Sequence, residues 1–137
     1  MFKTDIMDLD IKKDLTSNWF KLLQESFCND IKILENNNKE FKSKIWKKNP
    51  VRDEGGGEYR ILKNGKVFDK VGVNFSKVYG KFPKQFQKNI PGASKDPRFW
   101  ASGISIVMHM QILTFLQCIL ILDLFVPQRI GLAEEWI

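Results

Sequence analysis

The chain has 137 residues, of which 43% are hydrophobic and 28% charged, so it has the size and polarity of one soluble domain with one modest core. This composition excludes a disordered or fibrous segment. The formal net charge of +6 allows an anionic partner such as a nucleic acid, a membrane surface or a polycarboxylate, without choosing among them. Nearly all of the positive charge is lysine spread through the first two-thirds of the chain, which favours a solvated surface over a nucleic-acid interface.

Two cysteines, Cys28 and Cys118, lack the spacing of a zinc site or of a disulfide framework. A reducing compartment is therefore expected. The first thirteen residues include acidic side chains and have no long apolar core, which excludes a secretory signal. We therefore expect a cytoplasmic protein.

The first predicted element is an amphipathic helix that begins at Thr16 or Ser17, either of which can act as the N-cap, and ends near residues 36–38. Its apolar side chains recur at steps of three and four residues: Trp19, Leu23, Phe27, Ile31 and Leu34. A short basic segment over residues 41–46 is compatible with one or two further helical turns before Pro50. Trp19 and Trp46 are predicted to be core anchors.

After the glycine run at residues 55–57, strand-favouring residues predominate. The dipeptide Asn64-Gly65 lies between two such runs and predicts an antiparallel hairpin with a type I′ turn. Residues 81–97 have no sustained period and are predicted to form a loop. A second strand region is predicted over residues 104–108, ending at His109.

The segment from Ile112 to Val126 is apolar except for Thr114, Gln117 and Asp123. It is shorter than the roughly 20 residues that a membrane helix needs, and an aspartate is costly within a bilayer. Three interpretations remain open for this segment: a buried helix, a weak membrane anchor, or a sequence that was never selected as protein.

Two blocks of sequence carry a resemblance to a known family. Residues 55–76, GGGEYRILKNGKVFDKVGVNFS, and residues 101–109, ASGISIVMH, resemble the opening signatures of the oxygen-dependent coproporphyrinogen III oxidases. The resemblance implies an α+β fold in which an N-terminal helix packs on part of a large antiparallel β-sheet, an incomplete copy of the family fold.

After Met110 the resemblance stops, but it continues in another reading frame. If each new codon takes the third base of one residue and the first two bases of the next, residues 118–123 permit the family strand His-Phe-Asn-Thr-Arg. Residues 130–137 then permit Trp-Phe-Gly-Gly-Gly-x-Asp. We therefore expect residues 1–110 to be the N-terminal part of a coproporphyrinogen oxidase domain, and residues 111–137 to be an out-of-frame apolar tail.

The family converts two propionates of coproporphyrinogen III to vinyl groups, giving protoporphyrinogen IX in haem biosynthesis. It uses dioxygen and requires no organic cofactor or metal. The resemblance implies that Ser105 binds substrate, that Arg60 faces a propionate, and that His109 is a possible divalent-metal ligand. Each has a plain structural alternative: a strand serine, a surface-strand arginine and a structural histidine. The glycine run at 55–57 either lets another backbone approach or forms a loose turn, and the turn is favoured.

The family's proton-donor histidine, its Asn-x-Arg clamp and its Gly-Gly-Gly-x-Asp loop all lie beyond the break. No catalytic residue is therefore expected to be retained, and the chain is expected to be an inactive fragment that lacks the contacts of the family homodimer. Two other classes of function remain open. One is a small basic protein tethered to a membrane by residues 112–126, and the other is a nucleic-acid-binding module based on the +6 charge alone.

Overall fold

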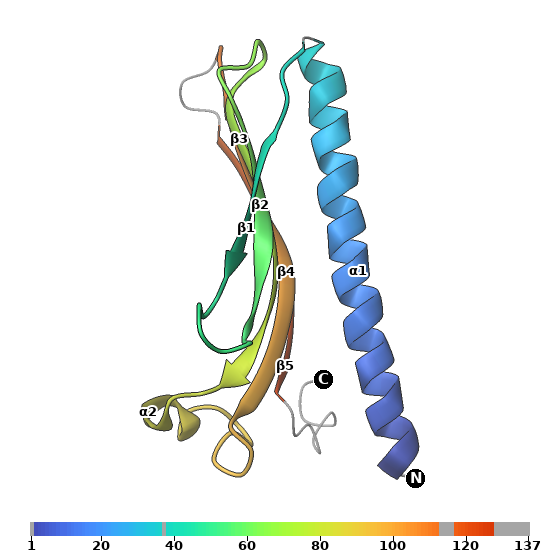
Figure 1. The fold of residues 1–137 in the computed structure, drawn as a ribbon, viewed down its shortest axis with the longest axis vertical. Coiled ribbons are helices and arrows are strands. Elements are labelled where there is room, and N and C mark those ends of the chain that lie inside the picture. The colour runs from blue at the N-terminus through green and yellow to red at the C-terminus, as the bar shows by residue number, and fades with distance from the viewer. Residues whose placement is uncertain (1, 37, 113–116, 128–137) are drawn as a thin grey trace.

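The computed structural model describes residues 2–36, 38–112 and 117–127, and in it a long N-terminal helix lies along one face of a five-stranded antiparallel sheet (Figure 1). The strands are neighbours in chain order, so the sheet is a meander. The predicted α+β class, with an N-terminal helix packed on an antiparallel sheet, is confirmed. The elements are α1 (Phe2–Glu35), β1 (Lys42–Lys47), β2 (Gly55–Lys63), β3 (Phe68–Lys81), α2 (Lys84–Gln87), β4 (Arg98–Met110) and β5 (Gln117–Pro127).

Helix α1 begins at Phe2, well before the predicted N-cap at Thr16 or Ser17. Ser17 lies inside the helix, where its hydroxyl donates to the carbonyl of Asp14 at 3.3 Å. Residues 2–15 contain neither glycine nor proline, so nothing in their sequence interrupts the helix. An ion pair one turn apart, between Lys12 Nζ and Asp8 Oδ2 at 2.6 Å, adds a small local stabilisation.

The buried face of α1 matches the apolar periodicity only in part: Ile31 is buried and Leu23 and Phe27 pack against the core, but the other two positions are exposed. Trp19 and Leu34 are 53% and 59% exposed, so the prediction that Trp19 anchors the core is wrong. The face toward the sheet mixes polar and apolar side chains at helical spacing: Lys13, Ser17, Phe20, Gln24, Cys28, Ile31 and Glu35. Because several of these buried positions are polar, the pattern of apolar residues alone cannot locate the whole buried face of the helix.

Residues 42–47 form the edge strand β1, so the expectation of further helical turns there is wrong. The strand pairs antiparallel with β2, and this long-range pairing overrides the weak helical pattern of the segment. Residues 81–97 are mostly loop, as predicted, but they include the single helical turn α2.

The predicted hairpin is present as β2 and β3, but its connection is not a type I′ turn. Asn64 has a φ of 54°, whereas Gly65 does not adopt a positive φ. The connection is organised by the carboxylate of Glu35, which is 1% exposed and accepts hydrogen bonds from the N–H groups of Lys66, Val67 and Phe68. A Cβ added at Gly65 would lie 2.4 Å from Glu35 Oε1, so glycine is needed there for space rather than for its φ.

The apolar C-terminal segment contributes the second edge strand, β5, which pairs antiparallel with β4. The helical interpretation of this segment is therefore wrong for residues 117–127, and residues 113–116 lie outside the described part. Leu122 and Leu124 pack against the core, whereas Ile119 and Ile121 are 59% and 61% exposed on the other face. Both faces of β5 thus carry apolar side chains.

The two faces of the sheet differ in what covers them. On the face toward α1, residues of the central strands form the core with the helix: Val71, Val73 and Phe75 of β3, and Ile104 and Ile106 of β4. We call the opposite face the open face, because α1 lies on the other side of the sheet (Figure 1). Residues that are directly paired across antiparallel strands point to the same side, so the register assigns each side chain to a face.

Candidate functional site

Ser105 lies at one end of a polar row on the open face, with Asn74 in the middle of the row. The register pairs Ser105 of β4 with Asn74 of β3, and Asn74 with Tyr59 of β2. Since paired residues share a face, three side chains that can donate or accept hydrogen bonds lie side by side across the three central strands. Each of them is half-buried. This row offers a ligand several hydrogen-bonding groups on a rigid sheet.

Next to this row the open face is hollowed. The hollow has a volume of about 330 Å³, and its floor includes Ile61, Gly72 and Val107, which occupy one register row. A Cβ added at Gly72 would have no heavy atom within 4 Å. The missing side chain of Gly72 therefore leaves an apolar space between Ser105 on one side and His109 on the other.

His109 lines the far end of this hollow, where it pairs with Lys70 of β3. Among residues 2–36, 38–112 and 117–127, no three His, Cys, Asp or Glu side chains come together as a metal site requires. The ammonium group of a neighbouring lysine also disfavours a second cation. The described residues therefore do not fit a metal at His109, and its role as a metal ligand stays a prediction without structural support.

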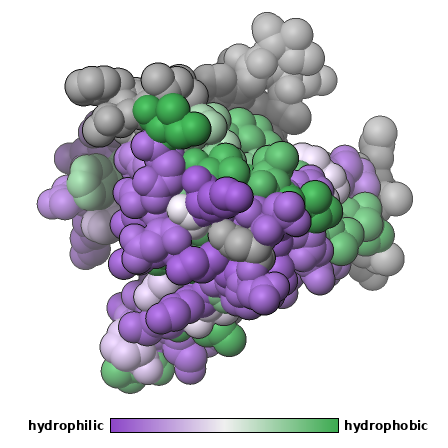
Figure 2. Space-filling view, turned by 90° about the horizontal axis from the view of Figure 1, so that it is seen from above, coloured by the Kyte–Doolittle hydropathy of each residue, from purple (hydrophilic) through white to green (hydrophobic). Residues whose placement is uncertain are grey.

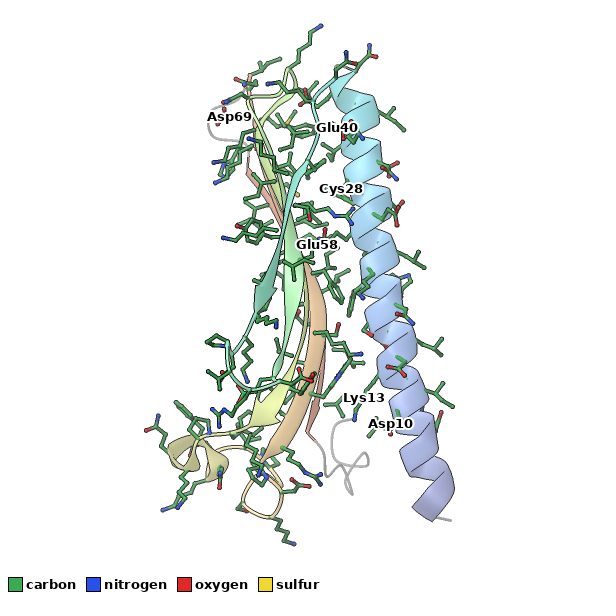
Figure 3. All side chains as sticks on the ribbon, in the orientation of Figure 1. Asp10, Lys13, Cys28, Glu40, Glu58 and Asp69 are labelled. Atoms are coloured by element: carbon green, nitrogen blue, oxygen red, sulfur yellow. The ribbon has the colours of Figure 1, made fainter. Side chains whose placement is uncertain are left out.

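Arg60 lies on the opposite face of the sheet from Ser105 and His109, so the structure does not bring the three predicted site residues together. Its Nε donates to Glu58 Oε1 at 3.1 Å, and this hydrogen bond raises the pKa of the guanidinium. Figure 3 shows Glu58 and Cys28 in the layer between the sheet and α1. Burial raises the pKa of the Cys28 thiol to about 11 even though Arg60 opposes this shift, so the thiol is neutral and inert. In this position, Arg60 forms part of the packing between helix and sheet.

A hydrogen bond from Trp46 to Asn74 was not anticipated from the sequence. The indole Nε1 of Trp46 donates to Asn74 Oδ1 at 3.0 Å. Because the indole can only donate, it fixes the amide oxygen toward Trp46 and turns the amide N–H groups of Asn74 away from it. Trp46 is half-buried on the open face rather than in the main core, and it orients a polar group beside Ser105.

The glycine run lies inside strand β2 and is not the loose turn that was favoured. Only Gly55, at the start of the strand, has a positive φ, of 78°. A Cβ at Gly57 would lie 1.9 Å from the carbonyl oxygen of Phe75 and 2.9 Å from Cζ2 of Trp46. The run therefore permits close approach of the neighbouring backbones, and it lets Trp46 lie over β2.

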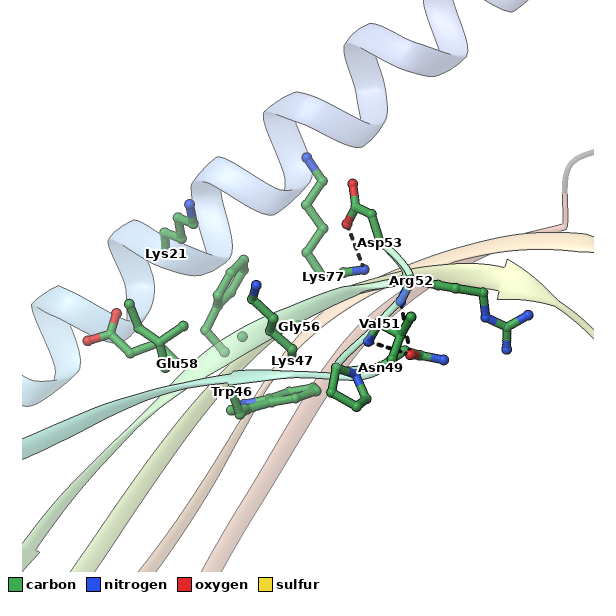
Figure 4. A pocket seen from close by; sticks show the side chains of 15 residues that line it. Lys21, Trp46, Lys47, Asn49, Val51, Arg52, Asp53, Gly56, Glu58 and Lys77 are labelled. Carbon is green, nitrogen blue, oxygen red and sulfur yellow. Dashed lines mark hydrogen bonds between the residues drawn. The ribbon is translucent and has the colours of Figure 1, made fainter.

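A separate hollow of about 530 Å³ lies between α1 and the β1–β2 connection (Figure 4). Lys21 extends from α1 and Lys77 from β3 at its border. Lys77 Nζ lies 3.6 Å from Asp14 Oδ1, and Arg52 Nη2 lies 3.3 Å from Glu54 Oε1, so two of its cations already have acidic partners. None of the predicted site residues lines this hollow.

The comparisons with known proteins identify the family. The family described as coproporphyrinogen III oxidase matches residues 15–112. Oxygen-dependent coproporphyrinogen-III oxidases of Rickettsia akari (strain Hartford) and Rickettsia bellii (strain RML369-C) are each 40% identical to the chain over 103 residues. The corresponding protein of Rickettsia felis is 39% identical over the same length. Each match covers 72% of this chain and 37% of the relative, so the chain spans about 37% of the length of these curated relatives.

The resemblance carried by residues 55–76 and 101–109 is therefore confirmed. Both blocks lie within the matched range, as do Tyr59, Asn74, Ser105 and His109 of the open face. In the part of the chain that the structure describes, no helix is long and apolar enough to cross a membrane.

Proposed function

The chain belongs to the coproporphyrinogen III oxidase family, and we propose that it binds coproporphyrinogen III on the open face of its sheet. In the complete enzyme this face would serve the oxygen-dependent oxidative decarboxylation of coproporphyrinogen III to protoporphyrinogen IX, with dioxygen as oxidant and no required cofactor. One observation carries the proposal. The family-matched strands surround a hollow that has an apolar floor at Gly72 and polar groups at its border, including Ser105 and Asn74.

The chemistry of the hollow suits this ligand. The apolar floor offers a surface for the flat faces of a macrocycle, and half-buried hydrogen-bonding groups can orient its substituents. Ser105 is proposed to contact the substrate directly, with Asn74 beside it held in orientation by Trp46. Arg60 is proposed to act only through the packing of α1 on the sheet. Cys28 and Cys118 are both free thiols, which is compatible with a reducing compartment, and we place this function in the cytoplasm.

We further propose that residues 111–137 are an out-of-frame tail and that this chain alone does not turn over substrate. The end of the family match at residue 112 supports this proposal, as does the family pattern in the shifted codons of residues 118–123 and 130–137. The family's proton donor and carboxylate clamp lie in that shifted frame. A chain without them retains binding groups but lacks the family's proton donor for catalysis.

The frame is tested by sequencing the gene through the codons for residues 109–137 and beyond. We expect the shifted frame to continue into a long open stretch that encodes the remaining family motifs. If that frame closes after a few codons, the tail is a genuine part of the protein and this proposal fails.

The binding function is tested by replacing Gly72 with leucine. The variant is expected to fold normally, because nothing lies within 4 Å of the added Cβ, and to lose at least tenfold in affinity for coproporphyrin III, because the side chain fills the hollow. Coproporphyrin III is the stable oxidised form of the substrate, and its binding is measured by fluorescence anisotropy. Gly72→Ala, which fills less of the hollow, should lose less affinity. Unchanged affinity in a folded Gly72→Leu chain would place the ligand elsewhere.

A further inference from the structure

Four lysines lie along one end of the open face. Lys42 and Lys44 belong to β1, Lys63 to β2 and Lys70 to β3. The register pairs Lys63 directly with Lys70, and Lys70 with His109. Lys42 pairs with Ile61 and Lys44 with Tyr59, so all four ammonium groups extend from the face that contains the hollow.

This end of the face is continuous with the hollow at Gly72. Lys70 lines that hollow, and the other three lysines line an adjoining hollow of about 720 Å³. Tyr59 and Ile61 line both hollows and form the boundary between them. Figure 2, which views the molecule from the end near the β2–β3 connection, shows mostly hydrophilic residues there.

The positive charge at this end is not neutralised within the described residues. None of the four lysines forms an ion pair there, although Lys12, Lys32 and Lys77 all do. Among the acidic strand residues that the register pairs, Asp123 of β5 is the one on the open face. It lies in the register row of Gly103.

Two other acidic residues lie close to the lysines without pairing with them. Glu40 borders the adjoining hollow, but its carboxylate is bound to Lys32 at 2.7 Å. Asp69 lies at the bulge next to Lys70 and is exposed. Like charges directly opposite each other, as at Lys63 and Lys70, disfavour the pairing of their strands. An anionic ligand would relieve this repulsion.

We propose that Lys42, Lys44, Lys63 and Lys70 form a subsite that binds the carboxylates of a polycarboxylate ligand. The inference rests on the proposed function, and it assigns the substrate's propionates to this end of the face. A macrocycle over Gly72 would extend its peripheral carboxylates past Tyr59 and Ile61 toward the lysines. Lysine suits this role, since its long flexible side chain can follow carboxylates of differing position.

The test uses the whole 137-residue chain and the double variant Lys63→Gln/Lys70→Gln, titrated with coproporphyrin III. Loss of two partly solvated ion pairs is expected to weaken binding on the order of three- to tenfold and to reduce its dependence on salt. The matched control is Lys84→Gln/Lys88→Gln, which removes the same charge from exposed residues at α2 and should change affinity by less than about twofold. Urea denaturation checks that both double variants fold.

A second probe, benzene-1,2,4,5-tetracarboxylate, separates the subsite from the macrocycle. It is expected to shift the backbone amide resonances of residues 63 and 70 in the unsubstituted chain and not in Lys63→Gln/Lys70→Gln. If coproporphyrin III binds both double variants equally well, the subsite is refuted while the proposed function stands. If only the benzene derivative binds at the lysines, the proposed function fails and the subsite stands. If neither probe binds, both are overturned.

Discussion

Replacing Glu35 with alanine is expected to lower the free energy of unfolding by about 3 kcal/mol, which is a large share of the stability of a small domain. The Glu35 carboxylate is buried and accepts hydrogen bonds from three successive backbone N–H groups, those of Lys66, Val67 and Phe68. Without this acceptor, the N–H groups under the end of α1 lose their partner while still shielded from water. The β2–β3 connection and the C-terminal end of the helix should therefore loosen together.

Urea denaturation followed by far-UV circular dichroism measures this loss as a shift in the transition midpoint. The matched control is Glu25→Ala, because Glu25 is exposed on the same helix and should change stability by less than about 0.5 kcal/mol. Glu35→Gln should fall between the two, since the amide oxygen still accepts hydrogen bonds but carries no charge. Equal midpoints for Glu35→Ala and Glu25→Ala would show that the carboxylate does not hold the connection.

The Asn64-Gly65 dipeptide shows how a correct prediction can rest on an incomplete reason. The dipeptide correctly predicted the hairpin, because few other residues accept such tight turns. The geometry of the connection, however, is set by Glu35, a residue far away in the sequence. Local turn chemistry cannot reveal a buried carboxylate that approaches from a helix, and so the turn type could not be predicted.

The periodicity of apolar residues did not predict the full buried face of helix α1 or the existence of strand β1. Gln24 and Glu35 occupy the buried face of α1 because each has hydrogen-bond partners in the sheet or in the β2–β3 connection, and such long-range partners are not visible in the sequence. Strand β1 is largely exposed along its length, so it has no alternating pattern to predict it.

The candidate site could be predicted in part. The family blocks correctly singled out the strands of the open face, because the resemblance covers β2, β3 and β4. The resemblance could not assign each side chain to a face of the sheet, because a shift of one residue in register moves a side chain to the other face. Arg60 therefore joined Ser105 and His109 as a predicted site residue although the register separates them. Lys63, Lys70 and Asn74 could be recognised as neighbours of Ser105 and His109 only once the strands were paired.

Gly57→Ala is expected to destabilise the sheet by about 3 kcal/mol, whereas Gly72→Ala on a neighbouring strand is expected to leave its stability within about 0.5 kcal/mol. The two glycines differ in what surrounds the missing side chain. At Gly57 the added Cβ would lie 1.9 Å from the carbonyl oxygen of Phe75, which is backbone and cannot rotate away. At Gly72 it would enter open space, where a strand tolerates alanine well.

Both variants add one methyl group to a glycine of the same sheet, so a comparison of their urea midpoints isolates the effect of the close approach. The loss in Gly57→Ala should also displace Trp46, whose Cζ2 lies 2.9 Å from the added Cβ, and should weaken its hydrogen bond to Asn74. Tryptophan fluorescence should therefore change in Gly57→Ala and not in Gly72→Ala. If both variants kept the stability of the unsubstituted chain, the glycine run would have no role in bringing β1, β2 and β3 together. The orientation of Asn74 beside Ser105 would then need another cause.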